Sequence, residues 1–511
     1  MSAYLLLLTA SLGLGAERFG GQAFYLGDPH VHSGASGDGG STDLGVCEGT
    51  CGAMAEIAET ARANGLDWMA LTDHVNGSRT ANARDFSLAF TTMLGAHDPE
   101  GGFVVLPGAE LRIGTPDGDQ GHKNLYFAAS NSELAEMTID DLRFDGAGAD
   151  IESCDALWTW ALELEHRWGD LMLLAHHPTR VGRMGTDWSC HRGELAAHFS
   201  PAVEVYSRHG DGMACPTDHD ALPEGCQEGS EAIAALDPEG HALRLSFVGG
   251  TDAHDTLPGN VCALDTEIPE HAYGGGLTVV VLDDDQLFDR DALFHAIQQG
   301  STYATTGPML PVVVDYIVGD RRLGGMGETL VVPHDQPLRV ELRLPAQREH
   351  TLSVVVLVTP AGEEPMRAAG DGVYHAEIAA GALPTWVYPR VELDGSLWYD
   401  EPCRDGGADS LEQLWISPSY LTVGELDTGD PGDTGDTGPD DTSGDSTAPD
   451  SDPPGDSDQP GDSDPPGDSG GGSETSSCRS SCTQGGPAPA MFLALALLGL
   501  AMTARRERKG R

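Results

Sequence analysis

The chain has 511 residues, enough for two folded units with additional segments, and its apolar fraction of 39% is sufficient for hydrophobic cores. Acidic residues outnumber basic ones by 81 to 28, which gives a formal net charge of -53. A surface this acidic repels nucleic acids and anionic lipids, so nucleic-acid binding through a basic patch is excluded.

The chain begins with a short apolar run at positions 4–15 that ends in small residues around Ala16. This pattern is typical of the core and cleavage region of a signal peptide, and a buried first element is the alternative. We therefore predict a signal peptide over residues 1–16 and an exported protein of the cell envelope or cell surface, either attached or released. Eight cysteines in the expected folded region are compatible with disulfides in such a compartment.

Short apolar runs alternate with helical patterns over residues 22–308. This alternation is typical of an α/β fold with a largely parallel sheet. The expected strands are 23–26, 66–71, 103–107, 124–128, 171–175, 202–206 and 243–248, and the expected helices are 53–64 and 156–168.

Nearly every expected strand ends in or beside a histidine or a carboxylate. His30 and His32 are two residues apart, so on an extended chain their rings share one face. One such histidine usually has a structural role, but the recurrence at six strand ends favours a metal site, because imidazole and carboxylate bind zinc, manganese and iron. The candidate ligands are His30, His32, Asp38, His74, Glu110, His122, His177 (or its neighbour His176), Asp252 and His254.

The order of these motifs resembles a known superfamily. His-x-His, Thr-Asp-His, Gly-x-Glu, Gly-His, Ala-His-His-Pro and Thr-Asp-Ala-His occur in the order of the PHP (polymerase and histidinol phosphatase) superfamily of metal-dependent phosphoesterases, over about residues 24–308. Segments 203–210, 258–259 and 303–307 also resemble an exported bacterial branch of unknown function. The resemblance implies a distorted (β/α)7 barrel and a site for two or three divalent metal ions (zinc, manganese or iron).

The resemblance also implies a ligand set for each metal. The first would be held by His30, His32, Glu110 and Asp252, the second by Glu110, His122 and His177, and the third by Asp38, His74 and His254. Asp38 stands where some members of the superfamily have a histidine. His176 remains an alternative to His177.

Two cations bridged by one carboxylate can share a water molecule and generate a hydroxide nucleophile near neutral pH. We therefore predict hydrolysis of a small phosphoester, with Glu110 and Asp252 as catalytic carboxylates and Lys123 and Arg180 as phosphate contacts. Arg208 is a third candidate, and surface salt bridges are the alternative for each arginine. Glu204 is expected to orient a ligand. The alternative functions are hydrolysis of carboxylic esters or amides and a non-catalytic, metal-stabilised module that binds a surface.

The character of the chain changes after residue 308. Segments 311–318, 338–344, 351–358, 372–378, 386–393 and 414–420 predict a small antiparallel β-sandwich over residues 309–423. Residues 424–477 are rich in Asp, Gly, Pro and Ser and predict a disordered acidic linker.

The C-terminal residues 478–511 contain two cysteines, a Gly-Gly pair, an apolar run at 488–504 and a final basic cluster. This arrangement resembles the sorting tails of some exported bacterial proteins. It predicts a transmembrane helix before processing, with the sorting machinery as a partner.

Overall fold

The computed structural model describes residues 16–36, 53–76, 83–115, 118–143, 151–181, 184–215, 226–236, 243–254, 257–259, 261, 275–393 and 412–425. They all belong to one compact unit, Met1–Asp430. The predicted signal peptide except Ala16, the acidic linker beyond residue 425 and the C-terminal tail lie outside the described residues. Among the helices that are described, none has the length and apolar character needed to cross a lipid bilayer.

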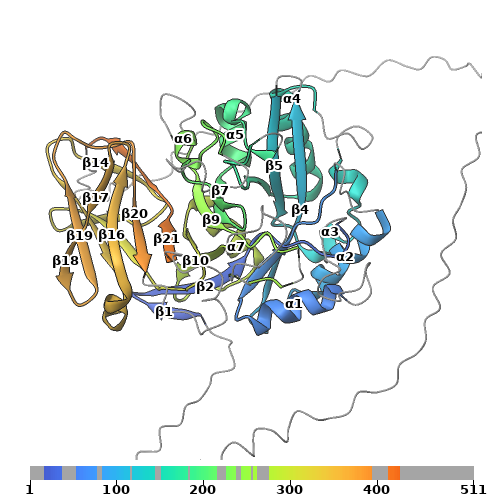
Figure 1. Cartoon of the computed structure of the whole chain (residues 1–511), viewed down its shortest axis with the longest axis horizontal. Helices are drawn as coiled ribbons and strands as arrows, with labels where there is room; N and C mark the ends of the chain where they lie inside the picture. Colours follow the sequence, from blue (N-terminus) through green and yellow to red (C-terminus); the bar gives the residue numbers. More distant parts are fainter. Residues whose placement is uncertain are drawn as a thin grey trace, which may run out of the picture. The chain divides into compact units, whose positions relative to one another are not determined.

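The first part of the unit contains eleven of the described strands (Figure 1). They are β1 (Glu17–Phe19), β2 (Gln22–Asp28), β3 (Trp68–Leu71), β4 (Val104–Thr115), β5 (Gly118–Phe127), β6 (Leu171–Ala175), β7 (Ala202–Ser207), β8 (Gly210–Asp211), β9 (Ser246–Gly249), β10 (Leu277–Asp283) and β11 (Thr302–Thr305).

Helices lie between several of these strands. They are α1 (Ala53–Ala63), α2 (Ala83–Ala96), α3 (Asn131–Leu134), η2 (Ile139–Leu142), α4 (Cys154–Trp168), η5 (Trp188–Cys190), α5 (Gly193–Phe199), α6 (Ala232–Ala235) and α7 (Arg290–Gln299). The predicted helix 156–168 begins two residues earlier, because the Ser153 side chain accepts a hydrogen bond from the Ala156 backbone N–H and caps α4.

The fold is mixed α/β, with strands predominating. The prediction of a largely parallel sheet needs correction: β2, β3 and β4 are parallel, as are β6, β7 and β9, but β5 is antiparallel to both β4 and β6. The reason is the short link from β4 to β5, since a parallel neighbour needs a crossover of a dozen or more residues. β10 is likewise antiparallel to both β2 and β11.

A closed seven-stranded barrel is not confirmed. No backbone ladder joins β9 to β10 or β11 among the pairings of the described strands. Side-chain hydrogen bonds connect them instead: Thr278 Oγ1 donates to the Gly249 carbonyl at 2.8 Å, and Thr302 Oγ1 donates to the Phe247 carbonyl at 3.0 Å.

The strands of this part are buried on both faces. In β3, Met69 and Leu71 belong to the apolar cluster that also contains residues of α1, α2, α4 and α5. Trp68 and Ala70 belong to a separate cluster with residues of α7. Because neighbouring side chains on a strand point to opposite faces, this division places one strand face against the outer helices and the other against α7.

The second part is made of strands in two layers (Figure 1). One layer is an antiparallel sheet in the order β13-β12-β15-β19-β18, and the other contains β14, β16, β17, β20, β21 and β22. The bounds are β12 (Val313–Val318), β13 (Arg321–Gly324), β14 (Thr329–Val332), β15 (Leu338–Arg343), η8 (Ala346–Thr351), β16 (Leu352–Thr359), β17 (Gly362–Pro365), β18 (Arg367–Gly370), β19 (Val373–Ile378), β20 (Trp386–Leu393), β21 (Glu412–Ile416) and β22 (Ser419–Val423).

Two details differ from the predicted antiparallel sandwich. The segment 414–420 is divided between β21 and β22, because Pro418 lacks the N–H that a continuous strand would use. β22 is then parallel to β14. In addition, β21 pairs with β11, so one layer of the second part continues the sheet of the first.

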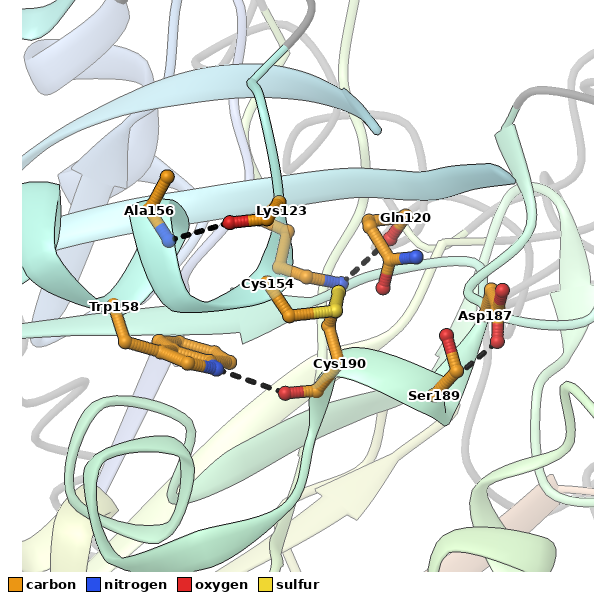
Figure 2. Close-up of a disulfide and its surroundings, with 9 residues drawn as sticks. Gln120, Lys123, Cys154, Ala156, Trp158, Asp187, Ser189 and Cys190 are labelled. Atoms are coloured by element: carbon orange, nitrogen blue, oxygen red, sulfur yellow. Dashed lines mark hydrogen bonds between the residues drawn. A yellow bond between two sulfur atoms is a disulfide. The ribbon is translucent and has the colours of Figure 1, made fainter. Parts of the chain in front are cut away.

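Two disulfides are formed among the described cysteines. Cys154–Cys190 joins α4 to η5 across 36 positions of sequence, and Cys215–Cys226 closes a shorter loop of 11 positions. The Trp158 indole N–H donates to the Cys190 carbonyl beside the first disulfide at 2.8 Å (Figure 2).

The loop lengths predict unequal effects on stability. Replacing both Cys154 and Cys190 by Ser should lower the free energy of unfolding by about 3–4 kcal/mol, because the longer loop restricts the unfolded chain more. The matched double variant at Cys215 and Cys226 should lose about 2–3 kcal/mol. Denaturant unfolding measures both, and an equal or reversed order would contradict the loop-closure explanation.

Candidate metal centre

The strand ends bring the predicted ligands into one cluster. His30 and His32 follow β2, His74 follows β3, and Asp252 follows β9. Isolated parallel bridges hold these ends together, between Val31 and Ala253 and between His74 and Glu110. The structure thereby assembles every predicted ligand that it describes, whereas Asp38 lies outside the described residues.

The β4–β5 hairpin supplies two ligands from one face. Glu110 pairs with Asn124 and Arg112 pairs with His122, so the side chains of Glu110 and His122 lie on the same side of the hairpin. The His122 Nδ1 atom lies 2.5 Å from Oε1 of Glu110.

In the first predicted ligand set, each histidine lies close to the other histidine and to both carboxylates. His30 Nε2 lies 3.3 Å from His32 Nε2, 3.4 Å from Glu110 Oε2 and 3.2 Å from Asp252 Oδ1. His32 Nε2 lies 3.0 Å from the same Glu110 oxygen and 3.3 Å from the same Asp252 oxygen. Ligands about 2.0–2.1 Å from one zinc ion at tetrahedral corners are separated by about 3.3–3.4 Å. These four side chains therefore fit a divalent metal.

The second set surrounds the other oxygen of Glu110. Ligand atoms of Glu110, His122, His176 and His177 all lie within 4.8 Å of one another. His176 Nε2 is 3.3 Å from Glu110 Oε1, and the His177 ring centre is 5.2 Å from that of His122. Both consecutive histidines thus reach the cluster, and the choice between them stays open.

The third predicted set is described only in part, because Asp38 lies outside the described residues. His74 and His254 group with His32, and their ring centres lie 4.8 Å and 4.1 Å from that of His32. His32 thus lies within reach of both the first and the third positions.

Several buried atoms of the cluster make no hydrogen bond of good geometry within the described structure. They are both ring nitrogens of His176, Nδ1 of His177 and Oδ1 of Asp252. Buried polar atoms are nearly always hydrogen-bonded, so such atoms in one cluster fit bound cations.

The electrostatics of the cluster also suit a cation. Burial lowers the pKa values of His122, His176 and His177, so these imidazoles are neutral, as metal binding requires. Burial opposes ionisation of Glu110 and Asp252, but positive charge on His74 beside Glu110 and on His30 beside Asp252, with hydrogen bonds from His122 and His209, holds both pKa values well below the usual range. The carboxylates are therefore ionised.

Two residues of the centre have left-handed backbone conformations. His177 has φ 33° and Asp252 has φ 51°. Non-glycine residues rarely adopt positive φ values, and such conformations concentrate at functional sites.

Three polar residues contact the predicted ligands at atoms that are not directed at the proposed metal position. Glu204 Oε2 lies 3.0 Å from Nδ1 of His30, on the side of the ring opposite the cluster, as expected for an orienting residue. Ser36 Oγ lies 3.2 Å from Nδ1 of His32. His209 Nε2 lies 2.7 Å from Asp252 Oδ2. The sequence reasoning assigned no role to Ser36 or His209, although His209 follows a strand end as the ligands do.

Lys123 does not join the cluster. It follows His122 on β5, so its side chain points to the opposite face of the strand. There it is fully buried beside the Cys154–Cys190 disulfide, and its Nζ donates to the Gln120 carbonyl at 2.9 Å (Figure 2). A phosphate contact for Lys123 therefore finds no support in its position.

The arginines are better placed. Arg180 is 8% exposed, and its Nη1 lies 3.4 Å from Nε2 of His209. Arg208 directly precedes His209 and is fully buried. In a chain with a large excess of acidic residues, Arg180 brings positive charge to the His209 edge of the centre.

Comparisons with known proteins give little further information. No family model and no curated protein matches the chain. Among solved structures, it is similar to a two-domain protein from Bacteroides vulgatus that contains a predicted PHP-like metal-dependent phosphoesterase. The two share 15% identity over 74% of this chain and 93% of that chain, with a TM-score of 0.34. So weak a similarity carries no argument about activity.

The contact between Glu204 and His30 predicts an effect on metal affinity. Glu204→Gln keeps an acceptor for the His30 N–H but removes the charge, and the affinity for zinc should fall about 10- to 100-fold. Competition with a chromophoric chelator measures this change. Glu165→Gln is the matched control, because Glu165 lies 2.7 Å from His198 in a more exposed pair. Equal zinc affinities for the two variants would show that Glu204 does not support His30.

Proposed function

We propose that this chain is a metal-dependent hydrolase of phosphoesters, with two or three divalent ions (zinc, manganese or iron). The proposal is carried by five separations of 3.0–3.4 Å, which link the Nε2 atoms of His30 and His32 to each other and to the carboxylates of Glu110 and Asp252. The finer fold proposed with it is a distorted (β/α)7 barrel.

Glu110 has the central role in this proposal. Its Oε2 atom faces His30 and His32, while its Oε1 atom faces His74, His122 and His176. One carboxylate can thus serve two neighbouring cations and hold them close together. When bound, divalent ions would supply Lewis-acid chemistry and lower the pKa of a water molecule.

The exposure of the ligands indicates the side from which substrate arrives. The side chains of His30 and His32 are fully buried, whereas those of His74, His122 and His254 are 9%, 11% and 13% exposed. A small substrate would approach over these three rings.

Arg180 favours a phosphoester over a carboxylic ester as the substrate. A buried guanidinium beside the cluster can donate two parallel hydrogen bonds to the oxygens of a phosphate group. The net charge of -53 opposes long-range attraction of anions, so the local arginine has to supply the compensation.

The proposed setting is outside the cytoplasm, at the cell envelope or surface. The two disulfides support this setting, because disulfides persist in oxidising compartments.

A substrate panel tests the proposed reaction. With added Mn²⁺ or Zn²⁺, the protein should hydrolyse p-nitrophenyl phosphate or bis(p-nitrophenyl) phosphate. Hydrolysis of p-nitrophenyl acetate alone would instead establish a carboxylic-ester hydrolase. Complete inactivity with metal retained would favour a non-catalytic surface module.

The shared carboxylates predict that bound metal and hydrolysis are lost together. Glu110→Gln and Asp252→Asn should each lose both bound metal and hydrolysis, because a neutral amide cannot balance the cationic charge. Elemental analysis measures the metal, with Glu165→Gln as the control. Full metal content in either variant would contradict the shared-carboxylate arrangement.

Arg180 predicts a change in substrate affinity rather than in metal content. Arg180→Met should raise KM for the phosphate ester roughly 10- to 100-fold, through loss of a charge-assisted hydrogen bond. Lys123→Met should leave KM unchanged, because Lys123 lies on the other face of β5. The reverse result would assign the phosphate contact to Lys123.

A further inference from the structure

The two carboxylate oxygens of Asp252 face different surroundings. Oδ1 lies 3.2 Å from Nε2 of His30 and 3.3 Å from Nε2 of His32, on the side of the predicted metal. Oδ2 lies 2.7 Å from Nε2 of His209, which belongs to none of the predicted ligand sets. One oxygen of the Asp252 carboxylate therefore faces the candidate metal centre, and the other faces a histidine beside it.

His209 is held in place independently of Asp252. It lies in the tight turn between β7 and β8, where Ser207 pairs with Gly210, and its backbone N–H donates to the Ser207 hydroxyl at 3.3 Å. Its ring packs edge-on against that of His177, with ring centres 4.9 Å apart. These contacts hold the His209 ring in place independently of the Asp252 carboxylate.

The contacts of His209 determine which nitrogen carries the proton. Nε2 faces Asp252 Oδ2 at 2.7 Å and Arg180 Nη1 at 3.4 Å. A carboxylate can only accept, so the shorter contact requires an N–H on Nε2. The guanidinium of Arg180 then makes no hydrogen bond to Nε2, because both groups are donors. His209 thus donates its Nε2–H to Oδ2 of Asp252.

The backbone of Asp252 does not by itself fix the orientation of its carboxylate. It has a left-handed φ of 51°, one residue before the bridge between Ala253 and Val31. A carboxylate freed from His209 could turn both oxygens toward one cation. That cation would then gain a fifth protein ligand atom, at the position where water or substrate could otherwise bind.

We propose that His209 is a positioning residue that holds Oδ2 of Asp252 and thereby leaves Oδ1 alone to bind metal. This role rests on the metal centre of the proposed function. It concerns how Asp252 binds rather than which ester is hydrolysed.

Cobalt-substituted protein tests the proposal without any substrate. Replacement of Zn²⁺ by Co²⁺ gives visible absorption that weakens when the coordination number rises. His209→Ala should keep the wild-type number of bound cobalt ions but absorb more weakly. His209→Gln should restore the wild-type spectrum, because its amide N–H can take the place of Nε2–H. His209→Asn, which is too short to reach Asp252, should resemble the alanine variant. The same spectrum in both variants would show that the weaker absorption of His209→Ala does not come from a folding defect.

The control is His198→Ala, which removes a histidine–carboxylate pair away from the centre and should leave the spectrum unchanged. If a phosphoester is hydrolysed, kcat should also fall about 10- to 100-fold in His209→Ala and recover in His209→Gln.

Two results would overturn the positioning role. Loss of a cobalt ion in His209→Ala would make His209 a ligand, and an unchanged spectrum would show that it does not control Asp252. The proposed function can fail separately. It fails if the wild type binds cobalt and the His209 variants show these spectral changes, but the wild type hydrolyses no ester.

Discussion

A buried carboxylate surrounded by imidazoles is the interaction on which the rest of this molecule depends. Glu110 is 1% exposed and would be costly to bury without partners. Its partners come from beyond the ends of β2, β3 and β6 and from the middle of β5, so three strand ends and the β4–β5 hairpin must meet at one place. The hairpin of β4 and β5 meets this requirement by putting Glu110 and His122 on one face.

Most of the centre could be predicted because its residue types stand at recognisable places. His30 and His32 follow an apolar run with a spacing of two, and Asp252 follows another strand, so extended geometry alone brings them toward a common edge. The same alternation, applied from His122 to its neighbour, places Lys123 on the far face of β5. Proximity in sequence to a ligand is therefore a poor guide to a phosphate contact on a strand.

Other features depend on contacts that a sequence pattern does not contain. The antiparallel direction of β5 follows from the short β4–β5 link, which periodicity does not reveal. His209 lies in a turn between β7 and the two-residue strand β8, too short to leave a hydrophobic pattern. The division at Pro418 separates strands that join different neighbours, and only the pairing of β21 with β11 and of β22 with β14 distinguishes them.

The pairing of β11 with β21 makes the second part of the unit a mechanical support for the centre. The Ser417 hydroxyl accepts a hydrogen bond from the Phe247 backbone N–H, and the Tyr420 hydroxyl donates to the Leu245 carbonyl. Both contacts lie on or beside β9, the strand that leads to Asp252. Without β21, the strand β11 would present an uncovered sheet edge, and edges of that kind pair with other chains. The candidate metal centre and the β-rich part therefore form one cooperative structure, in which the position of Asp252 is set partly by hydroxyl groups about 165 residues further along the chain.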